Sequence, residues 1–462
     1  MEKILTALDR AVWSWPLLLL VLGTGLYLSV RLRWIQLRRL PQALGSILRR
    51  EDARGGVSPF AALCTALSAT IGTGNLVGVA AALSLGGPGA LLWMELSAFT
   101  GMALKYAEGV LAVRYRLTLP DDSHEGGPFA YIALGLGMPR LARLFALLGA
   151  IAALFGVGTF VQVGSITGAA RFYLLRYTAL SPPATAAALA VLGLLLTALT
   201  AVLIAGGLRR ISSVSAVLVP VMAALYLGGC GWILLRRAAF LPSVLRQIAV
   251  TAFRPRAAAG GAAGGLLGVV QAGVSRGVFS NEAGLGSAPI AAAGADTDDP
   301  VREGLVSMTA TFFDTFLICT VTGLTLLVLG VSEGGVSAVA LAFAAGLPLP
   351  EPLGAGLVTL CLILFSFTTV IGWNYYGVQC LGWLSGRSPA ARRWYQRFYL
   401  LAVMIAPYLS LQSIFTAANL CNGLMAAPNL LALALLGGEV RRLTDRAGAL
   451  RGIRRRKDRQ SK

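Results

Sequence analysis

Two short polar runs inside long apolar stretches hold the residues best suited to chemistry. The first run covers residues 72–75 (GTGN), and the second covers residues 276–286 (RGVFSNEAGLG). Glycine, serine and asparagine are poor helix formers, so each run predicts an interrupted helix. An interruption exposes backbone N–H and C=O groups, which can bind a zwitterion and a bare cation.

Residue types that enzymes commonly use are scarce or badly placed. The chain has a single histidine, His124, and its six cysteines lie in apolar stretches without the paired spacing of a metal site. It also lacks the G-x-x-x-x-G-K-[ST] phosphate loop. These features predict a protein that is not an enzyme and needs no cofactor. Any uphill movement of a solute must then be driven by an ion gradient.

The two runs must be positioned by membrane-spanning helices. Of 462 residues, 56% are apolar and only 13% are charged, against about 25% in soluble domains. Long windows without charge repeat along the chain, and about 20 residues cross a bilayer. We predict an all-α polytopic membrane protein with eleven spans, near residues 12–30, 57–84, 87–112, 141–170, 182–206, 212–235, 262–292, 304–330, 353–381, 395–412 and 415–437.

The net charge of +19 would suggest nucleic-acid binding in a soluble protein, but here the basic residues flank apolar windows. With the N-terminus outside, 28 Lys and Arg residues fall on the cytoplasmic side and 9 outside. We therefore expect a multi-pass protein of the inner (plasma) membrane with a cytoplasmic C-terminus and no nucleic-acid partner. Five basic residues within 236–256 oppose this rule, which suggests a re-entrant or interfacial segment.

The spans divide into two similar halves. Residues 1–54 hold one extra span and an amphipathic cytoplasmic helix, residues 55–236 hold five spans, residues 258–438 hold five more, and residues 439–462 form a basic cytoplasmic tail. Each five-span half begins with an interrupted helix, and an odd number of spans inserts the halves in opposite orientations. Inverted repeats with broken first helices are typical of secondary transporters.

Several longer motifs resemble the alanine/glycine:cation symporter family. They are SATIGTGNLVG at 68–78, GGPGA at 86–90, GMALKYAEGVLAVRYR at 101–116, GGPFAYI at 126–132, GVFSNEAGLGSAPI at 277–290 and IGWNYYG at 371–377. The resemblance implies the fold of the bacterial leucine transporter, with two five-helix inverted repeats and one extra N-terminal helix. It also implies symport of small neutral amino acids, alanine or glycine, with Na⁺ or H⁺.

The resemblance also implies a site. The substrate-binding residues carried over are Gly72, Gly74, Asn75, Gln162, Ser280, Asn281, Thr369 and Trp373. For Na⁺, the expected ligands are backbone carbonyls near Ala69 and Gly72 with the hydroxyls of Thr368 or Thr369. Trp373 is expected to form a wall of the substrate pocket, where its indole excludes larger side chains.

Three charged residues inside spans are candidates for gating or coupling: Glu95, Arg276 and Glu282. We expect Arg276 and Glu282 to pair with each other or to gate the cytoplasmic path, and Glu95 to be structural rather than coupling. Asp314 and Glu108 are expected to be structural. Two other functions stay open: a channel or pore, which ion-dependent accumulation would exclude, and a non-transporting amino-acid sensor, which flux would exclude.

Overall fold

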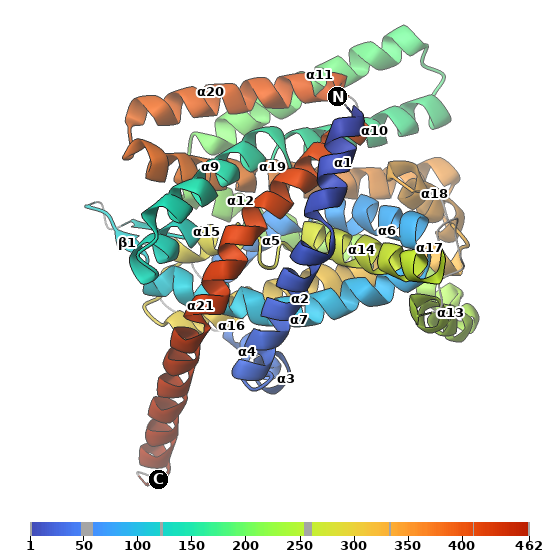
Figure 1. Ribbon diagram of the computed structural model, residues 1–462. Coiled ribbons are helices and arrows are strands. Elements are labelled where there is room, and N and C mark those ends of the chain that lie inside the picture. Colours follow the sequence, from blue (N-terminus) through green and yellow to red (C-terminus); the bar gives the residue numbers. More distant parts are fainter. Residues whose placement is uncertain are drawn as a thin grey trace.

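The computed structural model describes residues 2–47, 59–120, 123–253, 261–331, 334–409 and 411–460. Within these ranges the protein is almost entirely helical (Figure 1). The strands found there are β1 (Leu117–Thr118) and β2 (His124–Glu125), which pair in an antiparallel hairpin. An all-α membrane fold was the prediction from sequence.

The helices follow in chain order, with π-helical turns marked η1, η2 and η4 and 3-10 turns marked η3 and η5. They are α1 (Glu2–Val12), α2 (Trp15–Arg31), α3 (Ile35–Arg38), α4 (Leu40–Ile47), α5 (Pro59–Thr70), η1 (Gly74–Gly78), α6 (Val79–Gly86), α7 (Gly89–Arg114), α8 (Pro128–Ala130), η2 (Tyr131–Gly135), α9 (Pro139–Phe155), α10 (Phe160–Tyr177), α11 (Pro182–Ile204), α12 (Gly207–Arg236), η3 (Ala238–Phe240), α13 (Leu241–Phe253), α14 (Gly261–Asn281), α15 (Ala288–Ala293), α16 (Pro300–Thr311), η4 (Phe312–Cys319), α17 (Thr320–Val328), α18 (Val336–Gly346), α19 (Glu351–Ser385), α20 (Pro389–Ile405), η5 (Ala406–Tyr408) and α21 (Leu411–Gln460).

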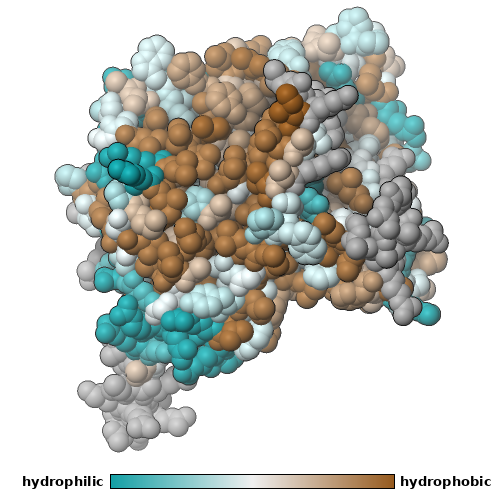
Figure 2. All heavy atoms as spheres, viewed as in Figure 1, coloured by the Kyte–Doolittle hydropathy of each residue, from teal (hydrophilic) through white to brown (hydrophobic). Residues whose placement is uncertain are grey.

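Six helices of the described chain are long and apolar enough to cross a membrane, or seven if the bent pair formed by α5 and η1–α6 counts as one span. Each of the eleven predicted ranges contains a helix or a consecutive set of helices, although the count of eleven spans stays a prediction. Figure 2 shows a broad apolar surface on the face that it presents. The two ends of the chain lie at opposite ends of the molecule in Figure 1.

The first interruption lies where it was predicted. Helix α5 ends at Thr70, Ile71 and Gly72 form a bend, and the chain re-enters a helix that continues through η1 into α6. The two parts meet at an angle of 51°. The bend leaves backbone groups free of the helical ladder, which is the condition that a binding site at membrane depth needs.

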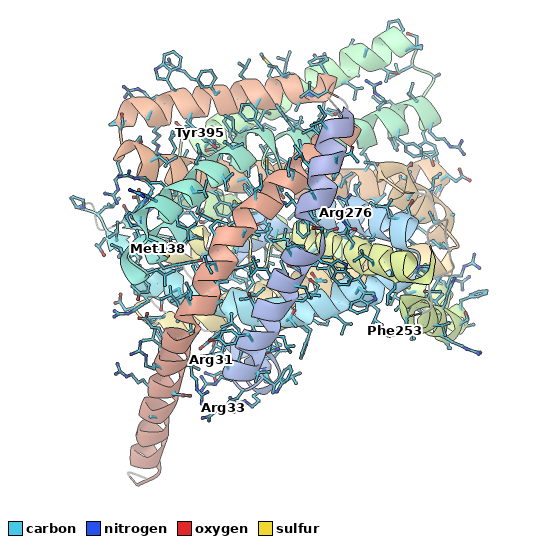
Figure 3. The ribbon with its side chains drawn as sticks, in the orientation of Figure 1. Arg31, Arg33, Met138, Phe253, Arg276 and Tyr395 are labelled. Atoms are coloured by element: carbon cyan, nitrogen blue, oxygen red, sulfur yellow. The ribbon has the colours of Figure 1, made fainter. Side chains whose placement is uncertain are left out.

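The second interruption is shorter than predicted. Helix α14 runs on to Asn281, and the non-helical segment covers only 282–287, before α15. Positive φ angles at Glu282 (56°), Gly284 (82°) and Gly286 (83°) mark it. Arg276 therefore lies inside the helix, so its predicted place in the break is wrong. It lies beside Phe279, with the guanidinium carbon 6.0 Å from the ring centroid (Figure 3).

Helix α7 is the central support of the two interruptions. It packs against α14 and α16 along its length and also contacts α15. On the other side, α19 packs against α5, α9 and α10. The interrupted helices α5–η1–α6 and α14–α15 are thus held between continuous helices, and their polar segments face protein rather than lipid.

Two peripheral segments were expected to lie at the membrane surface. The segment expected to be amphipathic, residues 31–50, contains α3 and α4 as far as Ile47, and residues 48–50 lie outside the described residues. Helix α13 buries Val244, Ile248 and Ala252 and exposes its other faces. It packs on α7, where the indole N–H of Trp93 donates to the Ala252 carbonyl (3.0 Å). This amphipathic form fits the interfacial segment that the five basic residues suggested.

Candidate functional site

The two interruptions touch each other through Gly74. A Cβ atom added to Gly74 would lie only 2.8 Å from the Cα atom of Ser280. Both residues are buried, and Ser280 is completely inaccessible. No side chain fits between the two helices at this point, so glycine allows residues from both breaks to form one site.

Asn75 connects the first break to α16–η4. Its Oδ1 accepts a hydrogen bond from the Gly72 backbone N–H (2.9 Å), and its Nδ2 donates to the Asp314 carboxylate oxygen Oδ1 (2.7 Å). Nδ2 also lies 3.1 Å from the Asp314 carbonyl. One buried amide therefore stabilises the bend and ties it to a carboxylate 239 residues later in the chain.

Asp314 is the centre of this network, a role that the sequence analysis did not give it. Its Oδ2 accepts hydrogen bonds from the Ser280 hydroxyl (2.9 Å) and the Thr315 hydroxyl (2.9 Å). Thr315 in turn accepts from Asn281 Nδ2 (3.1 Å). The available signal was an isolated aspartate in an otherwise apolar span, which is costly unless it is paired or functional.

Gln162 lies beside the first break as expected. Its Oε1 accepts from the Thr73 backbone N–H (3.3 Å) and would lie 3.1 Å from a Cβ on Gly72. Two consecutive backbone N–H groups of the bend, those of Gly72 and Thr73, thus point at side-chain oxygens. Such a pair of donors beside the start of a half-helix can also bind the two oxygens of a carboxylate.

The Thr369 hydroxyl stands among three backbone carbonyls. Its Oγ1 lies 3.0 Å from the Ser68 oxygen, 3.5 Å from the Ile71 oxygen and 3.1 Å from the Phe365 oxygen. A hydroxyl has one proton and can satisfy one acceptor fully. The convergence of four oxygens, three of them carbonyls, is therefore better suited to a hard cation than to a hydroxyl alone.

The carbonyls beside Thr369 each stand one position before those expected, since Ser68 precedes Ala69 and Ile71 precedes Gly72. Thr368 is also fully buried, and its hydroxyl donates to the Phe365 carbonyl (2.9 Å). That bond within its own helix is the ordinary behaviour of a threonine in a span. The structure thus brings both threonines to the same carbonyl oxygen of α19.

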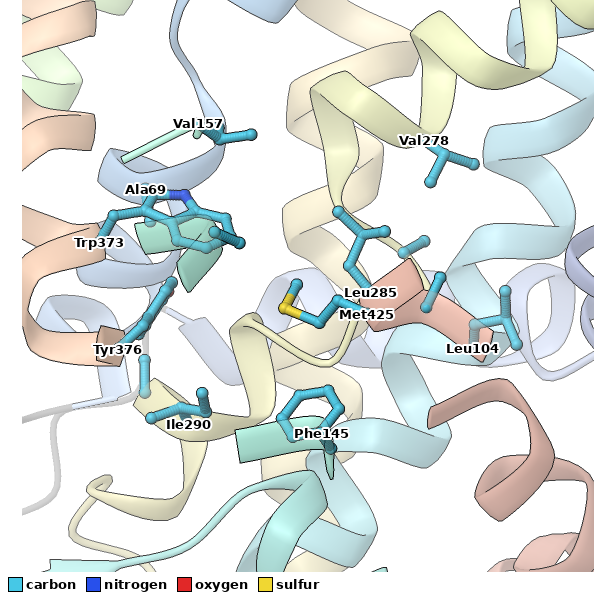
Figure 4. Close-up of a cluster of buried hydrophobic side chains, with 14 of the residues drawn as sticks. Ala69, Leu104, Phe145, Val157, Val278, Leu285, Ile290, Trp373, Tyr376 and Met425 are labelled. Atoms are coloured by element: carbon cyan, nitrogen blue, oxygen red, sulfur yellow. The ribbon is translucent and has the colours of Figure 1, made fainter. Parts of the chain in front are cut away.

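Trp373 is completely enclosed, with 1% of its surface exposed. Its indole N–H donates to Glu282 Oε1 (2.9 Å), and its ring packs edge-on against Tyr376 (5.6 Å between centroids). Figure 4 shows the indole beside Ala69 and Val157. The residue joins α19 to the second break and also lies next to the first, so it contacts both sides of the site.

Glu282 does not pair with Arg276. Its carboxylate accepts from Trp373 and from the Ser287 hydroxyl, which closes the turn of the second break. Arg276 lies instead near Phe279 and is attracted by Asp9 of α1. The predicted pairing is therefore wrong, because the unbroken helix through Asn281 carries Arg276 away from the turn.

Glu95 lies on α7 at the edge of the network. Its Oε1 accepts from the Thr320 hydroxyl (2.8 Å), and Thr320 is the first residue after η4. The side chain is partly exposed and makes no contact with the first or second break in the described hydrogen bonds. Its other oxygen, Oε2, is buried without a hydrogen-bond partner among the described residues, and the structural role expected of Glu95 stays a prediction.

A second group of charges lies on the other side of the second break. Glu108 Oε1 accepts from the Gly286 N–H (3.1 Å) and from Asn429 Nδ2 (2.7 Å). Lys105, one turn earlier on α7, is fully buried, and its Nζ makes no hydrogen bond within the described residues. Its ammonium attracts the carboxylates of Glu108, Glu282 and Asp314. Sequence reasoning placed Lys105 in a motif but gave it no role.

These residues form one buried centre with oxygen ligands, backbone donors and an excess of acidic over basic side chains. The acidic side chains are Glu108, Glu282 and Asp314, and the basic one near all three is Lys105. Such a centre can accept cationic groups that arrive from solution, because they reduce the cost of buried negative charge. Within the described residues no cluster of His, Cys, Asp and Glu has the arrangement of a metal-ion site.

The chain is similar to known transporters along nearly its whole length. It is 47% identical over 438 residues to an uncharacterized transporter of Haemophilus influenzae, with 94% of this chain and 93% of that one covered. It is 40% identical to the sodium/alanine symporter AgcS of Methanococcus maripaludis, with 95% of each chain covered. It is 35% identical to the probable sodium/glutamine symporter GlnT of Bacillus subtilis, with 94% and 88% covered.

A solved structure supports the fold. The crystal structure of MhsT in complex with L-phenylalanine matches with a TM-score of 0.57 and 17% identity, covering 84% of this chain and 90% of that one. MhsT has the leucine-transporter fold, which confirms the fold expected from the motifs. The model of the sodium:alanine symporter family matches residues 1–452. The chain therefore belongs to the sodium:alanine symporter family and is a multi-pass membrane transporter that couples amino-acid movement to a cation.

Proposed function

We propose that the protein imports small neutral amino acids, alanine or glycine, together with Na⁺ by alternating access. The observation that carries the cation part is the set of carbonyls of Ser68, Ile71 and Phe365 around the Thr369 hydroxyl. In the structure the Thr369 O–H is the hydrogen-bond donor near these carbonyl oxygens, and in the loaded transporter Na⁺ coordinates them instead. The Thr369 hydroxyl then turns its lone pairs toward the ion, and Thr368 supplies a further hydroxyl.

The substrate binds at the bend of the first break, beside Gln162, rather than at the close contact between Gly74 and Ser280. Its carboxylate takes the backbone N–H groups of Gly72 and Thr73 when Asn75 and Gln162 turn their amide oxygens away from them. The substrate ammonium is held by carbonyls of the second break and by the Gln162 oxygen. Gly74 and Ser280 bring the two breaks together, and Asn281 fixes the second one through Thr315.

The membrane arrangement belongs to the same proposal. Residues 55–236 and 258–438 are the two inverted repeats, and eleven spans place the N-terminus outside and the basic tail at 439–462 in the cytoplasm of the inner membrane. The 28-to-9 distribution of Lys and Arg supports this orientation. The two repeats rock around the site, so that it opens to one side at a time.

Transport in proteoliposomes tests the proposal. One net charge moved through 100 mV corresponds to about 2.3 kcal/mol, or about 50-fold accumulation. With an inward Na⁺ gradient and an inside-negative potential, labelled alanine should accumulate, and an ionophore should abolish the accumulation. A pH gradient imposed without Na⁺ should have no such effect, and if it alone drives uptake the coupling ion is H⁺.

The same assay separates the alternatives. A channel or pore would only equilibrate alanine across the membrane, and a sensor would bind it without flux. Competition by unlabelled glycine, alanine and glutamine defines the substrate range. Glutamine is included because a relative is named as a probable glutamine symporter. Strong competition by glutamine and none by glycine would refute the proposed preference for small substrates.

A further inference from the structure

Two spans end side by side at one place on the surface. Helix α2 ends at Arg31, and its guanidinium lies over α21 at Gly438, where an added Cβ would be 3.0 Å from Nη2. One turn before Arg31 on α2, the Tyr27 ring packs against Gly437 of α21. The Arg31 guanidinium carbon is 5.5 Å from the centroid of that ring. Exposed tyrosines and arginines at the end of a span are typical of the membrane–water boundary.

A hollow of about 680 Å³ opens at this boundary. Its lining changes from apolar to charged over one turn of α21, from Leu435 and Leu436 to Glu439 and Arg442, and Arg31 of α2 also lines it. Figure 2 shows a strongly hydrophilic patch below the apolar surface near the base of α21, and Figure 3 places Arg31 there. The hollow thus spans an apolar and a polar zone.

The charges that line the hollow are not balanced. Glu439 is engaged by Arg114 (3.3 Å) and by the Tyr115 hydroxyl (2.5 Å), and Asp445 pairs with Arg441 (3.5 Å). In the described part of the chain no carboxylate pairs with Arg31 or Arg442. The Nε atom of Arg31 is also buried without a hydrogen-bond partner among those residues. Two cationic groups therefore face the hollow without a counter-charge.

We propose that this hollow binds the headgroup of an anionic phospholipid. The phosphodiester lies between Arg31 and Arg442, and one acyl chain runs along Leu435 into the bilayer. Guanidinium groups bind phosphate oxygens through two parallel hydrogen bonds, and basic pockets between spans hold anionic headgroups. The leucine side of the wall favours a lipid over free phosphate, which has no apolar part.

Binding to the purified full-length protein tests this site. The probe is fluorescently labelled phosphatidylglycerol in micelles of neutral detergent, with labelled phosphatidylcholine as the uncharged comparison. Arg31→Gln and Arg442→Gln should each weaken phosphatidylglycerol binding about fivefold, the factor equivalent to about 1 kcal/mol per arginine at an anionic surface. Arg393→Gln, which removes an exposed charge near the start of α20, is the control and should bind as wild type does.

Three results would overturn the proposal. They are equal loss in the Arg393→Gln control, equal binding of phosphatidylcholine and phosphatidylglycerol by wild type, and displacement of the labelled lipid by inorganic phosphate at similar concentrations. Gly438→Ala provides a second test, because its methyl group pushes the Arg31 guanidinium from α21 without removing charge. It should weaken phosphatidylglycerol binding and leave the phosphatidylcholine background unchanged.

Discussion

Replacing Thr369 by valine removes one hydroxyl from the proposed cation site and keeps the branched shape of the side chain. In the structure this hydroxyl is the only side-chain oxygen of the described residues that lies within 3.5 Å of all three carbonyls, those of Ser68, Ile71 and Phe365. Valine leaves the carbonyls in place but presents a methyl group to them. We therefore expect weaker Na⁺ binding with little change in the fold.

The size of the effect follows from the contacts that are lost. An interaction between a neutral polar group and a charge contributes about 1.5–3 kcal/mol, which corresponds to roughly a 10- to 150-fold change in an equilibrium constant. The Na⁺ concentration for half-maximal uptake should therefore rise by at least tenfold in Thr369→Val. The maximal rate at saturating Na⁺ should change much less, because the substrate contacts around Gly72 remain.

The assay is initial-rate uptake of labelled alanine in proteoliposomes at increasing external Na⁺, with K⁺ replacing Na⁺ to hold ionic strength constant. Thermal unfolding in K⁺ and in Na⁺ separates ion binding from intrinsic stability. An ion that binds the folded protein raises its melting temperature, so the difference between Na⁺ and K⁺ reports Na⁺ binding. Thr369→Ser keeps the hydroxyl and should retain most of the affinity. Thr368→Val, whose hydroxyl contacts one carbonyl, should have a smaller effect.

Wild-type Na⁺ dependence in Thr369→Val would refute the assignment of the cation site. An equal loss in Thr369→Ser would also refute it, because the loss would then arise from packing rather than from the missing oxygen. A melting temperature that falls equally in K⁺ and Na⁺ would identify Thr369 as a structural residue of α19.

Substitutions at three further residues test the rest of the site and its surroundings. Asn75→Ala removes the link between the bend and Asp314 and should reduce alanine binding at least tenfold, measured by equilibrium binding to the purified protein; near-wild-type affinity would mean that the site is elsewhere. Trp373→Ala should weaken alanine binding and admit larger neutral amino acids, measured by competition of uptake; Trp373→Phe keeps one aromatic ring but loses the pyrrole ring and the bond to Glu282, and should have the same effect to a smaller extent. Wild-type selectivity in both variants would exclude the indole from the pocket. Glu95→Gln should leave the ion and pH dependence of uptake unchanged, and a flattened pH profile would show that this carboxyl couples protons.

Much of the architecture could be predicted because it depends on local properties of the chain. Span positions follow from the length of charge-free windows, and the first break follows from glycines at 72 and 74. The expected positions of Gln162, Thr369 and Asn75 came from motifs, and the structure places these residues beside the bend. Long apolar segments and family motifs both consist of consecutive residues, so predicting these features required no knowledge of distant contacts.

The extent of the second break could not be predicted in the same way. Its composition suggested an interruption from Arg276 onward, yet the helix continues to Asn281, with the Glu282 N–H still bonded to the Val278 carbonyl (2.9 Å). Polar residues break a helix when their side chains compete for its backbone. Here Ser280 donates to Asp314 instead, 34 residues away, so that competition is removed and the ladder persists.

The set of charged side chains in the buried site also depends on contacts between residues that are distant in sequence. Lys105 and Glu108 are three residues apart on α7, but the carboxylates of Glu282 and Asp314 reach the same region only after α14, α15 and η4 pack on that helix. In the sequence alone, a lysine within a span is an isolated charge whose burial in the membrane costs free energy. In the folded protein it is the one basic side chain beside three acidic ones, and an incoming cation can pair with those that are ionised. The proposed cation coupling thus depends on helix packing as well as on the residues proposed to contact the ion.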